Sequence, residues 1–221
     1  HPNFSDTAVH NGERYVWAAC YDDQVITQLN ASRGTTASFA AGSDILPLDV
    51  CYDALRHRLI VASADEQARM AVLDLTLSGE VVARQALAPA AGQGVCEGGA
   101  QGITIDARGD YWFALAYSGQ PGRGVVIKVD GSSLQPSRVI KDLSPRAPLE
   151  GLSNPNGIVT GDDRQNVFVF SDTGRIHQFD MDGNLLRVFI GLTMGYRGTV
   201  HGDSLWVAAW TPYPGALARI D

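Results

Sequence analysis

The chain has no long apolar run, no excess of basic residues and almost no cysteine. None of its apolar stretches approaches the roughly 20 residues that a membrane-spanning helix needs. Its 17 Lys and Arg residues are outnumbered by 24 Asp and Glu residues, which gives a formal net charge of -7. Because nucleic-acid binding requires clustered positive charge, we expect a soluble protein with neither a nucleic-acid nor a membrane partner. No segment resembles a signal peptide, and the compartment stays open, with secretion and a periplasmic location among the alternatives.

Only three cysteines are present, Cys20, Cys51 and Cys96. No Cys-x-x-Cys pair occurs, which disfavours both a disulfide framework and a zinc site built from thiolates. We expect buried thiols or at most one disulfide bond, with at least one thiol free. Cys51 lies in a predicted inner strand, so we expect it to be the least reactive of the three.

Familiar catalytic motifs are also missing. The chain contains no Gly-x-Ser-x-Gly elbow, no His-Glu-x-x-His and no P-loop. His10, His57, His177 and His201 stand at unrelated positions, so we expect structural or surface roles for them. With 221 residues, 45% of them hydrophobic, the chain can bury a full core. We therefore expect a single domain over residues 1–221.

What the sequence does contain is internal repetition. A short apolar strand, a polar turn and a second strand ending in small residues recur five times. Equivalent positions of the second strand are 44, 52, 56 and 38 residues apart, counted between Ala18, Ala62, Ala114, Phe170 and Ala208. The copies read TAVHNGERYVWAAC, LDVCYDALRHRLIVAS, QGITIDARGDYWFALA, NGIVTGDDRQNVFVFS and RGTVHGDSLWVAAW.

Each copy continues into a third strand, and the first four continue into a fourth after a turn marked by Gly34, Gly79, Gly131 or Gly183. Four antiparallel strands per copy, with Gly and Asp at the turns, describe one blade of a β-propeller. The sequence therefore predicts an all-β propeller of five four-stranded repeats, the last of them incomplete. Either the last blade has three strands, or the chain is a piece of a longer, six-bladed propeller.

A propeller buries its sheets by stacking neighbouring blades face to face. One aromatic or β-branched residue of the second strand in each copy is expected between blades. These residues are Val16, Ile60, Trp112, Phe168 and Trp206. We interpret this stripe as core rather than as a cofactor site.

The C-terminal half resembles a known family. The segments NPNGIVTGDDRQNVFVFSDTGRIHQFDMDGNLLRVF and RGTVHGDSLWVAAWTPYPGALARID resemble two consecutive blades of the regucalcin and gluconolactonase family, also called the senescence marker protein family, and more loosely NHL repeats. The segment AQGITIDARGDYWFALAYSG is similar to the blade before them, so the resemblance covers about residues 100–221. It implies a six-bladed propeller that hydrolyses a small lactone or ester with a divalent cation at the mouth of the central channel.

In that family a Glu, an Asn and an Asp hold the cation, which can be Ca²⁺, Mg²⁺, Mn²⁺ or Zn²⁺. The resemblance places the metal-binding Asn on Asn156, within Pro155-Asn156-Gly157. The family's Asp falls on Arg197, so a cationic side chain replaces a ligand. The family's Glu has no counterpart, because the matching segment reads Ser5-Asp6.

The substrate-contacting Asn-Asp-Gly of the family falls on Ala100, Gln101 and Gly102, which keep neither polar residue. A divalent cation or no cofactor at all are therefore both open. Because a guanidinium repels a cation, Arg197 favours an anionic or carbonyl ligand instead.

Aligning the copies places a ring of side chains at the predicted channel mouth. The ring comprises Ser5, Leu48, Gln101, Asn156 and Arg197, with Asp6 and Asp49 one residue further on. A polar ring would arise at any channel mouth open to water, but propellers also gather ligand groups there. The candidate ligand-binding residues are Asn156, Arg197, Gln101, Asp49 and Asp6.

Two classes of function follow from this ring. The first is a hydrolase of a small lactone or ester acting at the mouth, for which no catalytic residue is assigned beyond Asn156 as a metal ligand. The alternative is a non-catalytic propeller that binds a small anionic ligand or a protein partner through its loop face. The sequence does not fix the ligand or the oligomeric state.

Overall fold

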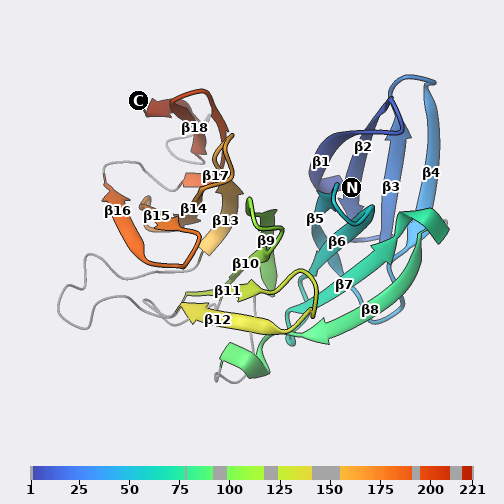
Figure 1. Cartoon of the computed structure of the whole chain (residues 1–221), viewed down its shortest axis with the longest axis horizontal. Helices are drawn as coiled ribbons and strands as arrows, with labels where there is room; N and C mark the ends of the chain where they lie inside the picture. The colour runs from blue at the N-terminus through green and yellow to red at the C-terminus, as the bar shows by residue number, and fades with distance from the viewer. Residues whose placement is uncertain are drawn as a thin grey trace.

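The computed structural model describes residues 2–77, 79–91, 99–116, 124–140, 155–190, 195–209 and 216–220 (Figure 1). The strands are β1 (Pro2–His10), β2 (Glu13–Cys20), β3 (Val25–Asn30), β4 (Thr35–Ala40), β5 (Pro47–Asp53), β6 (Arg58–Ser63), β7 (Arg69–Asp74), β8 (Glu80–Ala86), β9 (Ala100–Ile105), β10 (Tyr111–Leu115), β11 (Val125–Val129), β12 (Pro136–Ile140), β13 (Pro155–Thr160), β14 (Asn166–Ser171), β15 (Ile176–Asp180), β16 (Leu185–Phe189), β17 (Gly195–His201), β18 (Ser204–Ala209) and β19 (Ala216–Ile220). Two short 3₁₀ turns, Leu75–Leu77 and Pro89–Ala91, are the helical segments of the described residues, and none of these could cross a membrane.

The strands form five antiparallel sheets in chain order, which we call blades 1 to 5. In the part of the chain that the structure describes, blades 1 to 4 have four strands each, and blade 5 has three, β17, β18 and β19. The first strands of consecutive blades pack on one another, β1 on β5, β5 on β9, β9 on β13 and β13 on β17. The result is an all-β propeller, as the repeats predict, with blade 1 and blade 5 at the two ends of the arc in Figure 1.

Four apolar clusters fill the spaces between consecutive blades. Ile60 and Trp112 are fully buried there, and Phe168 packs against the cluster between blades 4 and 5. Val16 and Trp206 do not lie between blades as predicted. Each alternates along its strand with residues that face the neighbouring blade, so each points the opposite way and is only half-buried. Among the described residues, blades 1 and 5 each have a packed neighbour on one side only, and Val16 and Trp206 lie on the other side.

Each of the four later inner strands begins with a β-bulge. The pairing skips one residue, Leu48 in β5, Gln101 in β9, Asn156 in β13 and Tyr196 in β17. A bulge turns a side chain away from the regular alternation of the strand. These bulges set which residues stand at equivalent positions on the channel.

Candidate functional site

An ion pair between the second and fifth blades lies at the centre of the candidate site. The Arg197 guanidinium, from β17, lies with Nη2 2.7 Å from Oδ2 of Asp49, which comes from β5. Nη1 lies 3.4 Å from Oδ1 of the same carboxylate, so the pairing is two-pronged. Nη2 also donates to the backbone carbonyl of Gln101 in β9 at 3.2 Å. The structure therefore brings Arg197, Asp49 and Gln101 together from three blades.

Asp49 is almost completely buried, with 2% of its surface exposed. Its Oδ1 accepts a hydrogen bond from the backbone amide of Val50, and its Oδ2 accepts one from Ile103 in the next blade, both at 2.9 Å. Burial raises the pKa of Asp49, and the ion pair with Arg197 and the two amide bonds act in the opposite direction. Asp49 thus ties β5 to β9 and serves as the counter-ion of Arg197.

Asp6 makes the same kind of tie one blade earlier. Its Oδ2 accepts a hydrogen bond from the backbone amide of Tyr52 at 2.7 Å, and its Oδ1 accepts one from Thr7 at 2.7 Å. Burial, and then the Asp6 and Asp49 carboxylates, raise the pKa of the Cys51 thiol well above its usual range. Asp6 therefore ties β1 to β5 as Asp49 ties β5 to β9.

The strand register moves two members of the predicted ring by one residue. Arg197 pairs with Ala208, as Gly157 pairs with Phe170, so Tyr196 rather than Arg197 stands at the position of Asn156. Ser5 pairs with Ala18, which is equivalent to Phe170. Ser5 therefore also stands one residue later in the chain than the ring position. The sequence match aligned Gly198 with Gly157, whereas the pairing aligns Arg197 with Gly157. A one-residue offset of this kind exchanges the two faces of a strand.

Asn156 and Gln101 occupy bulge positions and are half-buried. The side chain of Asn156 makes no hydrogen bond with any described residue, and an amide can both donate and accept. The backbone carbonyl of Gln101 accepts a hydrogen bond from Arg197. Of the five candidate residues, the structure thus joins three through direct contacts, while Asp6 bonds within blades 1 and 2.

A divalent cation does not fit this set of donors. Among the described residues, no three His, Cys, Asp or Glu side chains gather in the way that a metal site requires. The two acids at the channel already have partners, since Asp49 binds a guanidinium and Asp6 accepts from two backbone amides. Asn156 would be the one ligand of the expected family set that remains.

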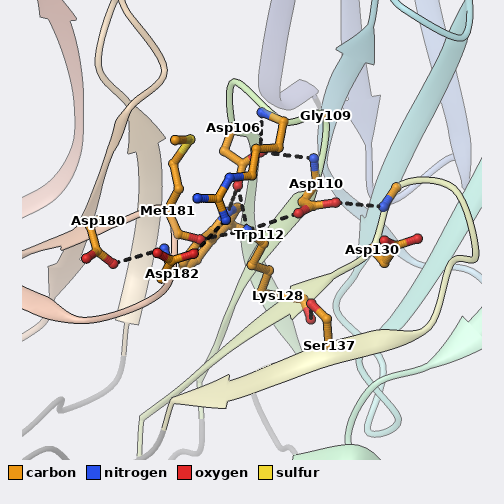
Figure 2. A network of polar contacts seen from close by, with 12 residues as sticks. Asp106, Gly109, Asp110, Trp112, Lys128, Asp130, Ser137, Asp180, Met181 and Asp182 are labelled. Atoms are coloured by element: carbon orange, nitrogen blue, oxygen red, sulfur yellow. Dashed lines mark hydrogen bonds and ion pairs between the residues drawn. The ribbon is translucent and has the colours of Figure 1, made fainter.

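A second charged cluster joins blades 3 and 4 (Figure 2). The Lys128 ammonium, on β11, lies 2.9 Å from Asp106, 3.0 Å from Asp110 and 2.7 Å from the carbonyl of Met181. The indole of Trp112 donates to the same oxygen of Asp106 at 2.9 Å. All these groups are satisfied by one another, so the cluster acts as a structural tie between blades.

Two histidines meet at the junction of blades 1 and 2. Nδ1 of His10 lies 2.7 Å from the hydroxyl of Tyr52, and Nδ1 of His57 lies 3.3 Å from the same oxygen. Burial and the neighbouring His57 lower the pKa of His10. The structural role expected for these two histidines fits this packing, although their proximity was not predicted from the sequence.

Cys20 and Cys51 are both free thiols, which confirms that at least one thiol is unpaired. Cys96 lies outside the described residues. The relative reactivity of the three cysteines stays a prediction.

Comparison with known proteins supports the fold and does not extend to function. No family model and no curated protein matches the chain in sequence. Among solved structures, 1356 chains match, too many to point to one activity. One is a chain of the nidogen/laminin complex solved by crystallography, with a TM-score of 0.68 and 15% identity, over 94% of this chain and 71% of that one. A likeness at this identity shows a shared β-propeller fold, and the resemblance to the regucalcin and gluconolactonase family is not confirmed by any of these matches.

Proposed function

We propose that this propeller is a non-catalytic binding module. Its ligand is a small neutral molecule with a carbonyl or hydroxyl group, which binds at the channel end formed in part by Arg197 and Asn156. The observation that carries the proposal is the ion pair between Arg197 and Asp49. It holds the N–H donors of the guanidinium in place and offsets the charge of one of the two carboxylates. Asn156 supplies an amide that can complement a hydroxyl or a carbonyl oxygen.

Formal charge argues against ionic ligands. Asp6, Asp49 and Arg197 carry -1, -1 and +1, so an anion would approach a set with a sum of -1. A cation gains from that sum, but both carboxylates already have partners, Asp49 the guanidinium and Asp6 two backbone amides. Beside the guanidinium it would also meet a like charge, and two like unit charges 4 Å apart repel by about 4 kcal/mol at an effective dielectric constant near 20. A neutral polar ligand meets neither cost, because hydrogen bonds to a charged donor are strong without requiring a charged acceptor.

Calorimetric titration with three matched ligands tests the proposal. We expect glucono-δ-lactone or glucose to bind saturably, and gluconate to bind more weakly because it carries a negative charge. Asn156→Ala should weaken binding about tenfold, because the variant loses one hydrogen bond to the ligand. Asn184→Ala, a substitution on an exposed turn of blade 4, is the matched control and should bind as the parent chain does.

Two outcomes would overturn the proposal. The first is the absence of binding to all three compounds. The second is tight binding of Ca²⁺, Mg²⁺, Mn²⁺ or Zn²⁺ that Asn156→Ala abolishes, together with lactone hydrolysis above the uncatalysed rate. That second result would support the metal-dependent lactonase or esterase instead.

A protein partner at the loop face is the second candidate. The solved structure that this chain resembles is a complex of two proteins, and propellers commonly bind through their loops. At 15% identity that likeness carries the fold alone. Neither partner of that complex is therefore carried over to this chain.

A further inference from the structure

The first strand of blade 1 ends in a different kind of residue from the first strands of the next two blades. His10 is the last paired residue of β1, as Asp53 is of β5. Asp106 stands at the corresponding place in blade 3, directly after β9. Asp53 joins its blade to the next one, because it accepts a hydrogen bond from the hydroxyl of Tyr111 at 2.6 Å. Blade 1 thus places an imidazole where blades 2 and 3 place a carboxylate.

This imidazole meets a second imidazole across the junction with blade 2. Nδ1 of His10 lies 2.7 Å from Oη of Tyr52, and Nδ1 of His57 lies 3.3 Å from the same oxygen. The centroids of the two imidazole rings are 5.2 Å apart, and the rings are inclined at 68°. Two nitrogens and one oxygen from two blades therefore form one cluster of donor atoms.

The hydrogen bonds of this cluster leave a lone pair on Nδ1 of His10. A phenolic hydroxyl has a single proton, so Tyr52 can donate to only one of the two imidazoles. The shorter contact is with His10, and we assign the proton of Nε2 to that ring. The side-chain amide of Asn11 lies 3.1 Å from Nε2 and can present its oxygen to this proton. An outer hydrogen bond of this kind orients the histidine ligands of metal ions.

The state of protonation also suits a metal ligand. Burial, and then the neighbouring His57, lower the pKa of His10. The imidazole is therefore neutral near pH 7, and only the neutral form binds a metal. Burial and the charge of Asp53 raise the pKa of Tyr52. Its hydroxyl thus stays protonated and is the weakest donor of the three.

The distances and the exposure fit a small tetrahedral ion. Zn²⁺ binds nitrogen and oxygen ligands at about 2.0–2.2 Å, so neighbouring ligand atoms of a tetrahedral site are about 3.3 Å apart. The contacts of 2.7 Å and 3.3 Å at Tyr52 are close to this spacing. His57 is exposed and His10 is half-buried. An ion can therefore reach both nitrogens from solvent, and a water molecule can complete its coordination.

We propose that His10, His57 and Tyr52 form a Zn²⁺ site that joins blade 1 to blade 2. Imidazole nitrogen selects Zn²⁺ and its neighbours Ni²⁺ and Co²⁺ over Ca²⁺ and Mg²⁺. Among the described residues, no three His, Cys, Asp or Glu side chains gather for a metal, and this site instead takes its third donor from a phenol. The proposal uses none of the residues of the channel end and does not depend on the function proposed there.

Calorimetric titration of the full chain with ZnCl₂, after treatment with a chelator and its removal, tests the site. We expect saturable binding of one ion per chain that an excess of Ca²⁺ or Mg²⁺ does not displace. His10→Gln and His57→Gln should each weaken binding by about tenfold or more, because each removes one of two nitrogen ligands. Tyr52→Phe should weaken it by only about threefold, since it removes a neutral hydroxyl.

Three matched controls locate the ion. His201→Gln removes an exposed imidazole of blade 5, and His1→Gln removes one outside the described residues. Asn156→Ala changes the channel end. All three variants should bind Zn²⁺ as the parent chain does.

Two further measurements report on the position of the ion and on its effect. Trp17 stacks on Tyr52 with ring centroids 4.9 Å apart. Co²⁺ accepts the same ligands and quenches nearby indoles, so it should lower the tryptophan emission of the parent chain and not that of Trp17→Phe. Zn²⁺ should also raise the urea midpoint of the parent chain and not that of His57→Gln, because an ion that binds only the folded state stabilises it.

Several results would overturn the proposal. One is the absence of saturable Zn²⁺ binding, and another is full binding by both His10→Gln and His57→Gln. Loss of binding in His1→Gln or His201→Gln would place the ion elsewhere, and loss in Asn156→Ala would place it in the channel. Circular dichroism checks the fold of each variant. If His10→Gln does not fold, His57→Gln decides the matter, since the side chain of His57 is exposed.

Discussion

Replacing Lys128 with Met removes the one positive charge from a buried cluster that also holds two carboxylates. The side chain of Lys128 is 7% exposed, and that of Asp106 is 0% exposed (Figure 2). Without the ammonium, Asp106 keeps the indole of Trp112 and the backbone amides of Arg108 and Asp110 as donors, but it loses its counter-ion. Breaking a buried ion pair from one side costs about 3–5 kcal/mol, because the remaining charge stays desolvated.

Urea unfolding followed by tryptophan fluorescence measures this loss. The matched control is Arg108→Met, which breaks the ion pair of Arg108 with Asp182 between the same two blades. Those side chains are 50% and 60% exposed, so the control should cost only about 0–1 kcal/mol. Adding Asp106→Asn to Lys128→Met should recover part of the lost stability, since it removes the uncompensated charge.

Equal losses for Lys128→Met and Arg108→Met would refute this reasoning. They would mean that water reaches Asp106 readily once the ammonium is gone, so that burial in the folded chain does not set the cost. A loss for Lys128→Met that Asp106→Asn deepens would also contradict it, because the hydrogen bonds of the carboxylate would then matter more than its charge.

Three further predictions concern the channel and its surroundings. Arg197→Met should raise the pKa of Asp49 further and lower the free energy of unfolding by about 3–5 kcal/mol, and Asp49→Asn added to it should restore part of this in thermal unfolding. Burial and the neighbouring His57 hold the pKa of His10 below its usual value of 6.5 in the folded chain, so its contribution to stability is present above pH 6.5 and lost as the pH falls through the folded pKa. His10→Gln should therefore reduce the fall in urea midpoint between about pH 7.5 and pH 5.5. The raised pKa of Cys51 disfavours its thiolate, so thiol labelling with site identification by mass spectrometry should modify Cys51 last, and fastest labelling of Cys51 would contradict this.

The propeller could be predicted because its signals are local. Turn glycines such as Gly79, Gly131 and Gly183 and the short apolar strands between them recur within each blade, and each blade is continuous in sequence. The three described strands of the fifth blade were predicted from the same pattern. Antiparallel strands joined by tight turns need no information from distant parts of the chain.

The site could be predicted only in part, because its contacts join distant blades. Arg197 and Asp49 are 148 residues apart, and no local pattern pairs them. The sequence match also aligned Gly198 with Gly157, whereas the pairing aligns Arg197 with Gly157, an offset of one residue. Such a shift matters most at the channel, where neighbouring positions of one strand point in different directions.

The Lys128 cluster left a signal that sequence reasoning could have used. The strand VVIKV places one lysine among apolar residues, and all five positions are buried. A lysine in a buried strand needs a counter-charge. The preceding turn, IDARGDYW, offers two acids, Asp106 and Asp110, which are the residues that bind it.

The ion pair of Arg197 and Asp49 also bears on how the fifth blade is held in place. Among the described residues, β1 and β17 do not pack on one another as the other neighbouring inner strands do. Blade 5 is therefore fixed along one side by β13 and across the channel by the contacts of Arg197 with Asp49 and Gln101. A loss of ligand binding in Arg197→Met could thus arise from a displaced blade as well as from a missing donor. The double variant with Asp49→Asn separates the two causes, because it removes the unpaired charge without restoring the donor: recovered stability with binding still absent would assign the guanidinium to the ligand.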